Sequence, residues 1–308
     1  VDGQPTELAR RVYRHFGDRI DYFAVHHYQP WQIKEVRRGD HPVDTAQLTA
    51  ADIWYTWVTL PDMGPDGQSC FHRAELNQAR ELRYKVAMTE WNWNGWWGPS
   101  LRDHVAFDSL FARGVGAAGI LHAIMRQGDV VELATQSMLI GDGWKIHAVW
   151  CDRNGKTPPF MLPSGQVTML YSRHHGSQRL QLDVSNMPCY EQPYRMAGIG
   201  PARQAAYLDI LATRDETRLY LHAINRHFEQ ALTLQVDFSA LGRSAGVEGT
   251  LHVLEGRLNN APAGSETLAP AEIREEKIDV ASHAVTARLP CRSVGVVEIP
   301  FLPAGPAR

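Results

Sequence analysis

One carboxylate among several tryptophans is the first feature of this sequence that suggests chemistry. Residues 85–97 read KVAMTEWNWNGWW, so Glu90 directly follows a short apolar run and precedes the tryptophans. Such a run, bounded by polar residues and glycine, predicts a buried strand of a parallel sheet. A carboxylate at the carboxyl end of such a strand lies where α/β barrels carry their active sites. Aromatic rings beside it can cover the apolar face of a sugar, so the pattern indicates carbohydrate chemistry.

A second interpretation of the same residues remains open. Glu90 could cap the helix that follows its strand, and the tryptophans could be core residues. Trp96 and Trp97 fit a sugar platform and a hydrophobic cover equally well. Short aromatic-rich runs do not separate these alternatives by pattern alone.

The flanking sequence predicts the elements that position Glu90. Helical spacing of apolar residues or helix-boundary signals predict helices over 6–16, 46–60, 72–84 and 103–126. Apolar runs predict strands over 20–27, 85–90 and 129–139. Alternating helices and strands with polar residues at the strand ends are typical of βα units. We therefore predict that residues 1–143 form the last three strands of a (β/α)8 barrel.

The periodicity changes near residue 143. Apolar residues then alternate with polar ones, as in Leu219/Leu221 and Leu251/Val253. Period-two strands separated by turn residues predict antiparallel structure. Residues 144–308 are therefore expected to form a C-terminal β-sandwich, interrupted by one helix near 164–174.

Composition narrows the class of partner. The 308 residues carry a formal net charge of −3, which gives no argument for a nucleic-acid or anionic membrane partner. No apolar run reaches the roughly 18 residues of a membrane span. The 14 histidines and four cysteines lack the spacing of a metal motif, so no metal site is expected.

Several short motifs, in order, resemble the family 51 α-L-arabinofuranosidases. The strand ending His26-His27-Tyr28 is similar to the Leu-His-x-Tyr at the family's sixth barrel strand. Thr89-Glu90-Trp91-Asn92 resembles the Asp-Glu-Trp-Asn of the seventh strand, and Ala134-Thr135-Gln136 resembles the Ala-Gln of the eighth. Residues 165–174 and 219–226 also resemble the helix before the family's sandwich and one of its central strands.

The resemblance implies a retaining glycoside hydrolase with a barrel and a C-terminal sandwich. Glu90 would be the catalytic nucleophile. The residues expected to contact substrate are His26, Tyr28, Gln136, Trp91, Trp96 and Trp97. Thr89 replaces the family's Asp before the nucleophile, which is expected to alter the support of Glu90 but not its identity. Residues 139–160 differ from the family's usual loop, so the binding cleft is expected to differ.

The family's acid/base glutamate has no counterpart here. It lies in an Asn-Glu motif at the fourth strand, and this sequence contains no Asn-Glu dipeptide. A retaining glycosidase needs two carboxyl groups. We therefore expect the chain to be the C-terminal portion of a longer enzyme and to be inactive alone. Two alternatives are another retaining barrel glycosidase of the same clan, such as a xylosidase-like enzyme, and a non-catalytic carbohydrate-binding or pseudoenzyme module.

The resemblance also implies partners and compartment. The expected substrate is an arabinofuranosyl-containing glycan, and family members are usually cofactor-free homo-oligomers. The residues themselves do not determine the compartment, and the resemblance favours the cytoplasm over secretion.

Overall fold

The computed structural model describes residues 7–29, 35–59, 73–93, 109–142, 146–196, 199–256 and 272–302. Trp96 and Trp97 lie outside these ranges, so their predicted contact with substrate stays a prediction. Within them, no helix is both long and apolar enough to cross a membrane.

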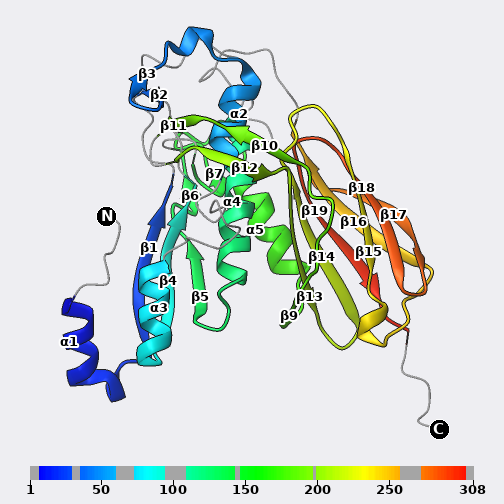
Figure 1. Cartoon of the computed structure of the whole chain (residues 1–308), viewed down its shortest axis with the longest axis horizontal. Coiled ribbons are helices and arrows are strands. Elements are labelled where there is room, and N and C mark those ends of the chain that lie inside the picture. Colours follow the sequence, from blue (N-terminus) through cyan, green and yellow to red (C-terminus); the bar gives the residue numbers. More distant parts are fainter. Residues whose placement is uncertain are drawn as a thin grey trace.

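The N-terminal part contains a three-stranded parallel sheet with the order β1-β4-β5 (Figure 1). Its strands are β1 (Tyr22–Tyr28), β4 (Lys85–Asn92) and β5 (Val131–Gln136). The accompanying helices are α1 (Glu7–Phe16), η1 (Gly17–Arg19), α3 (Arg73–Leu82) and α4 (Ser109–Met125). The helices and strands predicted for this part are confirmed where the structure describes them, and the predicted start of the helix at residues 103–108 lies outside the described residues. Whether the sheet belongs to a barrel stays a prediction.

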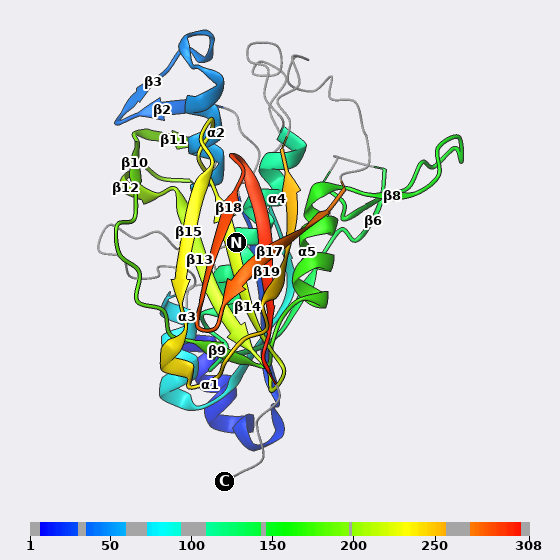
Figure 2. The ribbon, with the colours of Figure 1, turned by 90° about the vertical axis from the view of Figure 1, so that its right-hand side faces the viewer.

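The C-terminal part is an eight-stranded antiparallel sheet that curls back on itself (Figure 2). Its order is β15-β18-β17-β16-β19-β14-β13-β9. The strands are β9 (Gln178–Leu180), β13 (Leu208–Arg214), β14 (Arg218–Asn225), β15 (Leu232–Asp237), β16 (Glu248–Glu255), β17 (Arg274–Ala281), β18 (Ala284–Leu289) and β19 (Ser293–Pro300). A short helix, η4 (Ser239–Leu241), follows β15.

The predicted antiparallel strands are confirmed, but a single curled sheet replaces the two separate sheets of the predicted sandwich. The reason lies in β17, whose first part pairs with β16 while Val280 and Ala281 pair with β18. Hydrogen bonding therefore continues around the bend. A second apolar core fills the concave side, including Leu221, Leu251 and Val297.

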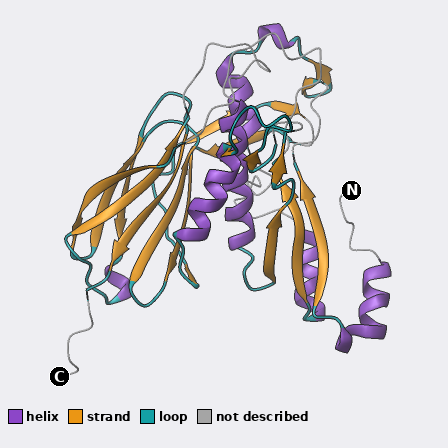
Figure 3. Cartoon of the chain, turned by 180° about the vertical axis from the view of Figure 1, so that it is seen from behind, coloured by secondary structure: helices purple, strands orange, loops and turns teal. Residues whose placement is uncertain are grey.

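Two helices lie between the two sheets (Figures 1 and 3). They are α4 and α5 (Pro163–Arg173), and α4 contacts β5 on one side and β13, β14 and β19 on the other. A Cβ at Gly116 would collide with the fully buried ring of Trp93. Close packing therefore requires glycine at this point of α4.

The remaining short elements lie at one end of the molecule and at the edge of the parallel sheet. They are β2 (Val36–Arg38), β3 (His41–Pro42), η2 (Thr45–Gln47), α2 (Ala50–Val58), β6 (Ile140–Gly141), β7 (Val149–Trp150), β8 (Phe160–Met161), β10 (Cys189–Gln192), β11 (Tyr194–Met196) and β12 (Ala202–Ala206). Because β2 pairs with β11, the N-terminal and C-terminal parts share a sheet as well as a core.

Candidate active site

The pairing of β1 with β4 is irregular beside Glu90. Val25 lies opposite Met88, but His26 lies opposite Glu90, so Thr89 is an extra residue on β4. A bulge of this kind re-aims the side chains that follow it and is common beside active sites. It brings His26 and Glu90 into register at the carboxyl ends of two parallel strands.

Glu90 is bound by Tyr28 and faced by His26. The Tyr28 hydroxyl donates to Oε2 of Glu90 at 2.6 Å. Nδ1 of His26 lies 3.6 Å from the same oxygen. The Glu90 side chain is 47% exposed and that of His26 53%, so the group is open to solvent. Two of the residues expected to contact substrate, His26 and Tyr28, therefore lie beside Glu90.

The hydroxyl of Tyr28 remains protonated and acts as a hydrogen-bond donor to Glu90. Burial raises the pKa of its phenol, and the hydrogen bond to the Glu90 carboxylate raises the pKa further. The phenol therefore stays protonated throughout the neutral range and fixes one carboxylate oxygen. The hydroxyl of Ser137 lies 2.7 Å from the Tyr28 oxygen and extends this chain of contacts.

Two residues that sequence reasoning missed connect the ends of β4 and β5. The buried side chain of Asn92 donates to the carbonyls of Ser137 at 3.1 Å and Ile146 at 3.0 Å. The Ser137 amide in turn donates to the carbonyl of Trp91 at 3.0 Å. Both residues are adjacent to strand ends, and the convergence of parallel strand ends is the signal that would have identified them.

Trp91 and Gln136 lie elsewhere. Trp91 is 1% exposed and belongs to the apolar core. Its partner across the sheet is Gln136, whose amide oxygen accepts a hydrogen bond from Thr168 of α5 at 2.8 Å. Trp91 follows Glu90 on β4, and successive strand residues point to opposite faces, so its side chain lies on the other face of the sheet. Gln136 pairs with Trp91, and no contact of either side chain with Glu90 is found within the described residues.

A second carboxyl group beside Glu90 is not found among the described residues. The other glutamate of the parallel sheet, Glu132, lies near the start of β5. There it pairs with Lys85 at 3.0 Å and accepts from Tyr22 at 3.0 Å. The described site can therefore present one oriented carboxylate to a ligand, but it has no paired acid and base.

Comparison with known proteins identifies solved structures with a similar fold. No family model and no curated protein matches the chain. Solved structures do match, and the chain resembles a fragment of the family 51 α-L-arabinofuranosidases. An arabinofuranosidase crystal structure aligns with a TM-score of 0.62 and 21% identity, over 94% of this chain and 55% of that one.

Two further structures agree. The α-L-arabinofuranosidase from Thermotoga maritima, in complex with arabinose, gives a TM-score of 0.59 at 20% identity, covering 94% of this chain and 55% of that one. The family 51 arabinofuranosidase from Xanthomonas axonopodis pv. citri gives 0.59 at 17% identity, with coverages of 96% and 56%. The chain thus spans little more than half the length of these proteins.

Proposed function

We propose that this chain is the nucleophile-bearing part of a retaining glycoside hydrolase that releases terminal α-L-arabinofuranosyl residues. One observation carries the proposal. Glu90 projects from a parallel strand end, 47% exposed, with the Tyr28 hydroxyl at 2.6 Å and the His26 imidazole at 3.6 Å. The likeness in fold to arabinofuranosidases supports the substrate class.

In the proposed reaction Glu90 attacks the anomeric carbon of the sugar. A covalent glycosyl-enzyme forms as the bond to the leaving oxygen breaks, and water then releases the sugar. Tyr28 orients the carboxylate by its hydrogen bond to Oε2, which leaves Oε1 for attack. His26, half-exposed on the neighbouring strand, lies where a sugar hydroxyl would approach.

The proposal places the three parallel strands in a (β/α)8 barrel within residues 1–143, followed by the C-terminal β-domain of residues 144–308. Apolar side chains on or beside this sheet are exposed, including Tyr22 at 47%, Leu133 at 48% and Ile140 at 62%. Both β1 and β5 lack a further neighbour among the described strands. Additional strands would cover these groups. The acid/base carboxyl, about 5–5.5 Å from Glu90, would come with them.

The test is covalent labelling of the protein expressed from its complete reading frame. A 2-fluoro-arabinofuranosyl inhibitor should attach to Glu90, and mapping of the modified peptide identifies the site. Glu90→Gln should abolish both labelling and hydrolysis of an aryl arabinofuranoside. Glu132→Gln is the matched control, because that glutamate is 41% exposed on the same sheet and should not affect labelling. Labelling of another residue would overturn the assignment.

The sugar specificity needs its own measurement. Hydrolysis rates of aryl α-L-arabinofuranoside, β-xyloside and β-glucoside should favour the arabinofuranoside. Preference for the xyloside would instead support the related clan enzyme, because such enzymes share the nucleophile strand.

A non-catalytic glycan-binding role is the second candidate, favoured by the lack of a paired carboxyl group around Glu90 in the described residues. It predicts that calorimetry detects arabino-oligosaccharide binding by this chain alone. It also predicts that Glu90→Gln leaves the affinity within about twofold, since no covalent step is involved.

A further inference from the structure

A cluster of two histidines and a glutamate lies far from Glu90, between the end of α5 and the curled sheet. His174 directly follows α5, His252 lies in β16 and Glu298 in β19. One ring nitrogen of each histidine and one carboxylate oxygen lie within 4.8 Å of one another. Their positions in the sequence, 78 and 46 residues apart, carry no metal-motif spacing, which explains why sequence reasoning found none.

Both histidines direct a ring nitrogen at the same carboxylate oxygen of Glu298. Nδ1 of His174 lies 2.8 Å from Oε2 of Glu298, and Nε2 of His252 lies 3.7 Å from that same oxygen. Three potential ligand atoms thus converge from three elements. The His252 side chain is 7% exposed, that of Glu298 16% and that of His174 22%, so one member is buried and two are partly buried.

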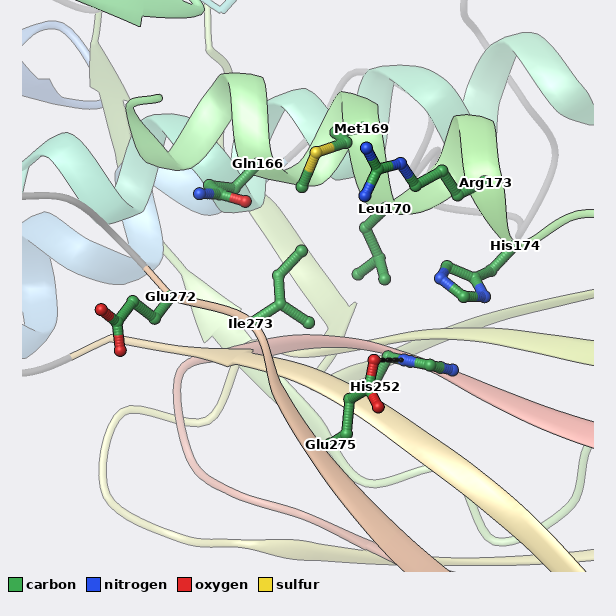
Figure 4. A pocket seen from close by; sticks show the side chains of 9 residues that line it. All are labelled: Gln166, Met169, Leu170, Arg173, His174, His252, Glu272, Ile273 and Glu275. Atoms are coloured by element: carbon green, nitrogen blue, oxygen red, sulfur yellow. Dashed lines mark ion pairs between the residues drawn. The ribbon is translucent and has the colours of Figure 1, made fainter. Parts of the chain in front are cut away.

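Outer contacts hold two of the three side chains by their other atoms. Nδ1 of His252 faces Oε1 of Glu275 at 3.3 Å, the dashed contact in Figure 4. Oε1 of Glu298 accepts from Arg218 at 2.9 Å, which leaves Oε2 directed at the histidines. Carboxylates that orient a ligand histidine through its second nitrogen are a recurring feature of zinc sites.

The cluster borders a cavity of about 380 Å³. Figure 4 shows His174 at the end of α5 facing His252 and Glu275 across this space. Glu272 also lines the cavity, on the sheet side, and Arg173 lines it from α5. Glu272 and Glu275 thus line the cavity together with one guanidinium, that of Arg173, and Glu298 pairs with Arg218 beside the histidines. The formal charge around the cavity is therefore favourable to a cation.

We propose that His174, His252 and Glu298 bind a divalent transition-metal ion of the zinc class, with its fourth position open to the cavity. Two imidazoles and one carboxylate are a donor set that Zn²⁺ accepts, and a three-ligand site leaves room for water or a further ligand. The ion joins the end of α5 to β16 and β19, and so fastens the helix to the curled sheet.

Binding requires a small rearrangement. The two imidazole rings are stacked, with centroids 3.9 Å apart and planes 32° apart. A metal must lie in the plane of each ligating ring, so one ring turns out of the stack as the ion enters. The 2.8 Å contact between His174 and Glu298 then opens to the ligand separation of about 3.3 Å that a tetrahedral zinc site has.

The experiment is titration of the metal-stripped chain with Co²⁺, which gives intense visible bands when four-coordinate. One equivalent should saturate the bands, Zn²⁺ should displace it, and saturating Zn²⁺ should raise the melting temperature. His252→Ala and Glu298→Gln should each remove the bands. Glu275→Gln should weaken binding by about 10- to 100-fold, because it changes only the group that orients His252.

His175→Gln is the matched control, because that exposed histidine is adjacent to His174 and absent from the cluster. It should bind Co²⁺ as the unchanged chain does. Glu275 is 69% exposed, so its substitution tests the site even if His252→Ala fails to fold. Weak binding of several equivalents, or one-equivalent binding unaffected by Glu275→Gln and Glu298→Gln, would overturn the proposal.

Discussion

The carboxylates of Glu90 and Asp209 have the same types of neighbouring side chain but differ in their exposure to solvent. Glu90 contacts a tyrosine and faces a histidine at the end of β4, with 47% of its side chain exposed. Asp209 in β13 contacts a histidine, which in turn contacts a tyrosine, but only 8% of its side chain is exposed. The same residue types therefore occur once in an open site and once in the core.

The two carboxylates also differ in whether arginine side chains pair with them. Asp209 is paired with Nη2 of Arg226 at 2.8 Å and also with Arg126, and Arg226 is fully buried. Burial raises the pKa of Asp209, but attraction to Arg126, His122 and Arg226 outweighs it and holds the pKa well below its usual value. No arginine or lysine pairs with Glu90 in the described residues. Its charge is thus left to interact with a ligand.

The roles follow from this contrast. His122 donates from Nδ1 to Asp209 at 2.9 Å and accepts from Tyr171 at 2.8 Å, which links α4, α5 and β13 in one buried chain. Both ring nitrogens of His122 and both carboxylate oxygens of Asp209 are bound by other side chains, so the set stabilises the packing of the helices on the sheet. Within the described residues, the contacts of Glu90 with Tyr28 and His26 both reach Oε2, so Oε1 is available for the nucleophilic role proposed above.

The largest expected effect comes from breaking the buried group. Asp209→Asn should lower the free energy of unfolding by about 3–5 kcal/mol, because it leaves the buried Arg226 without its counter-charge. Glu90→Gln should change it by less than about 1 kcal/mol, since the side chain is half-exposed. Urea denaturation of both variants measures the difference. Equal losses in the two variants would contradict the assignment of a structural role to one and a functional role to the other.

A smaller effect is expected from the tyrosines. Tyr171→Phe removes the donor to Nε2 of His122 in a site without solvent access, and should lower the free energy of unfolding by about 1–3 kcal/mol. Tyr28→Phe should cost less than about 1 kcal/mol, because water can replace its hydroxyl at the exposed Glu90. Thermal and urea unfolding of the pair provide the measurement. A larger loss for Tyr28→Phe would show that the Glu90 group, too, is structural.

The sequence predicted the part of the site that depends on local order. Alternating helices and strands imply neighbouring parallel strands that end at one edge, and the resemblance to family 51 motifs singled out His26, Tyr28 and Glu90 at those ends. The positions of the Trp91 and Gln136 side chains were harder to predict from the sequence. The face of the sheet on which a side chain lies depends on strand register, and the bulge at Thr89 shifts that register.

The buried clusters could not be predicted in this way. Asp209, His122 and Tyr171 come from three elements, and their separations in sequence follow no period. The same holds for His174, His252 and Glu298. The curled sheet was also missed, because alternation identifies strands but not the point at which β17 changes partner.

The pH dependence of stability sharpens the comparison further. Burial lowers the pKa of His122. The charge of Asp209 raises that pKa, and the charges of Arg126 and Arg226 lower it further, so the net shift is downward. Burial lowers the pKa of His222 well below its usual value. Because these pKa values lie below the unfolded value of about 6.5, their contribution is complete above that pH and is lost as the pH falls below it. The loss approaches about 1.4 kcal/mol per pH unit for each histidine.

Asp209 affects the pH dependence of stability in a second, more acidic pH range. Its depressed pKa contributes stability that is complete above the unfolded value of about 3.9 and declines as the pH falls further. Urea midpoints measured from about pH 7.5 to pH 5.5 isolate the histidine part. His222→Asn should reduce the slope in that range, because the buried imidazole of His222 stays neutral in the folded chain. An unchanged slope in His222→Asn would mean that the buried histidine is protonated in the folded state, contrary to its fully enclosed position beside Thr213.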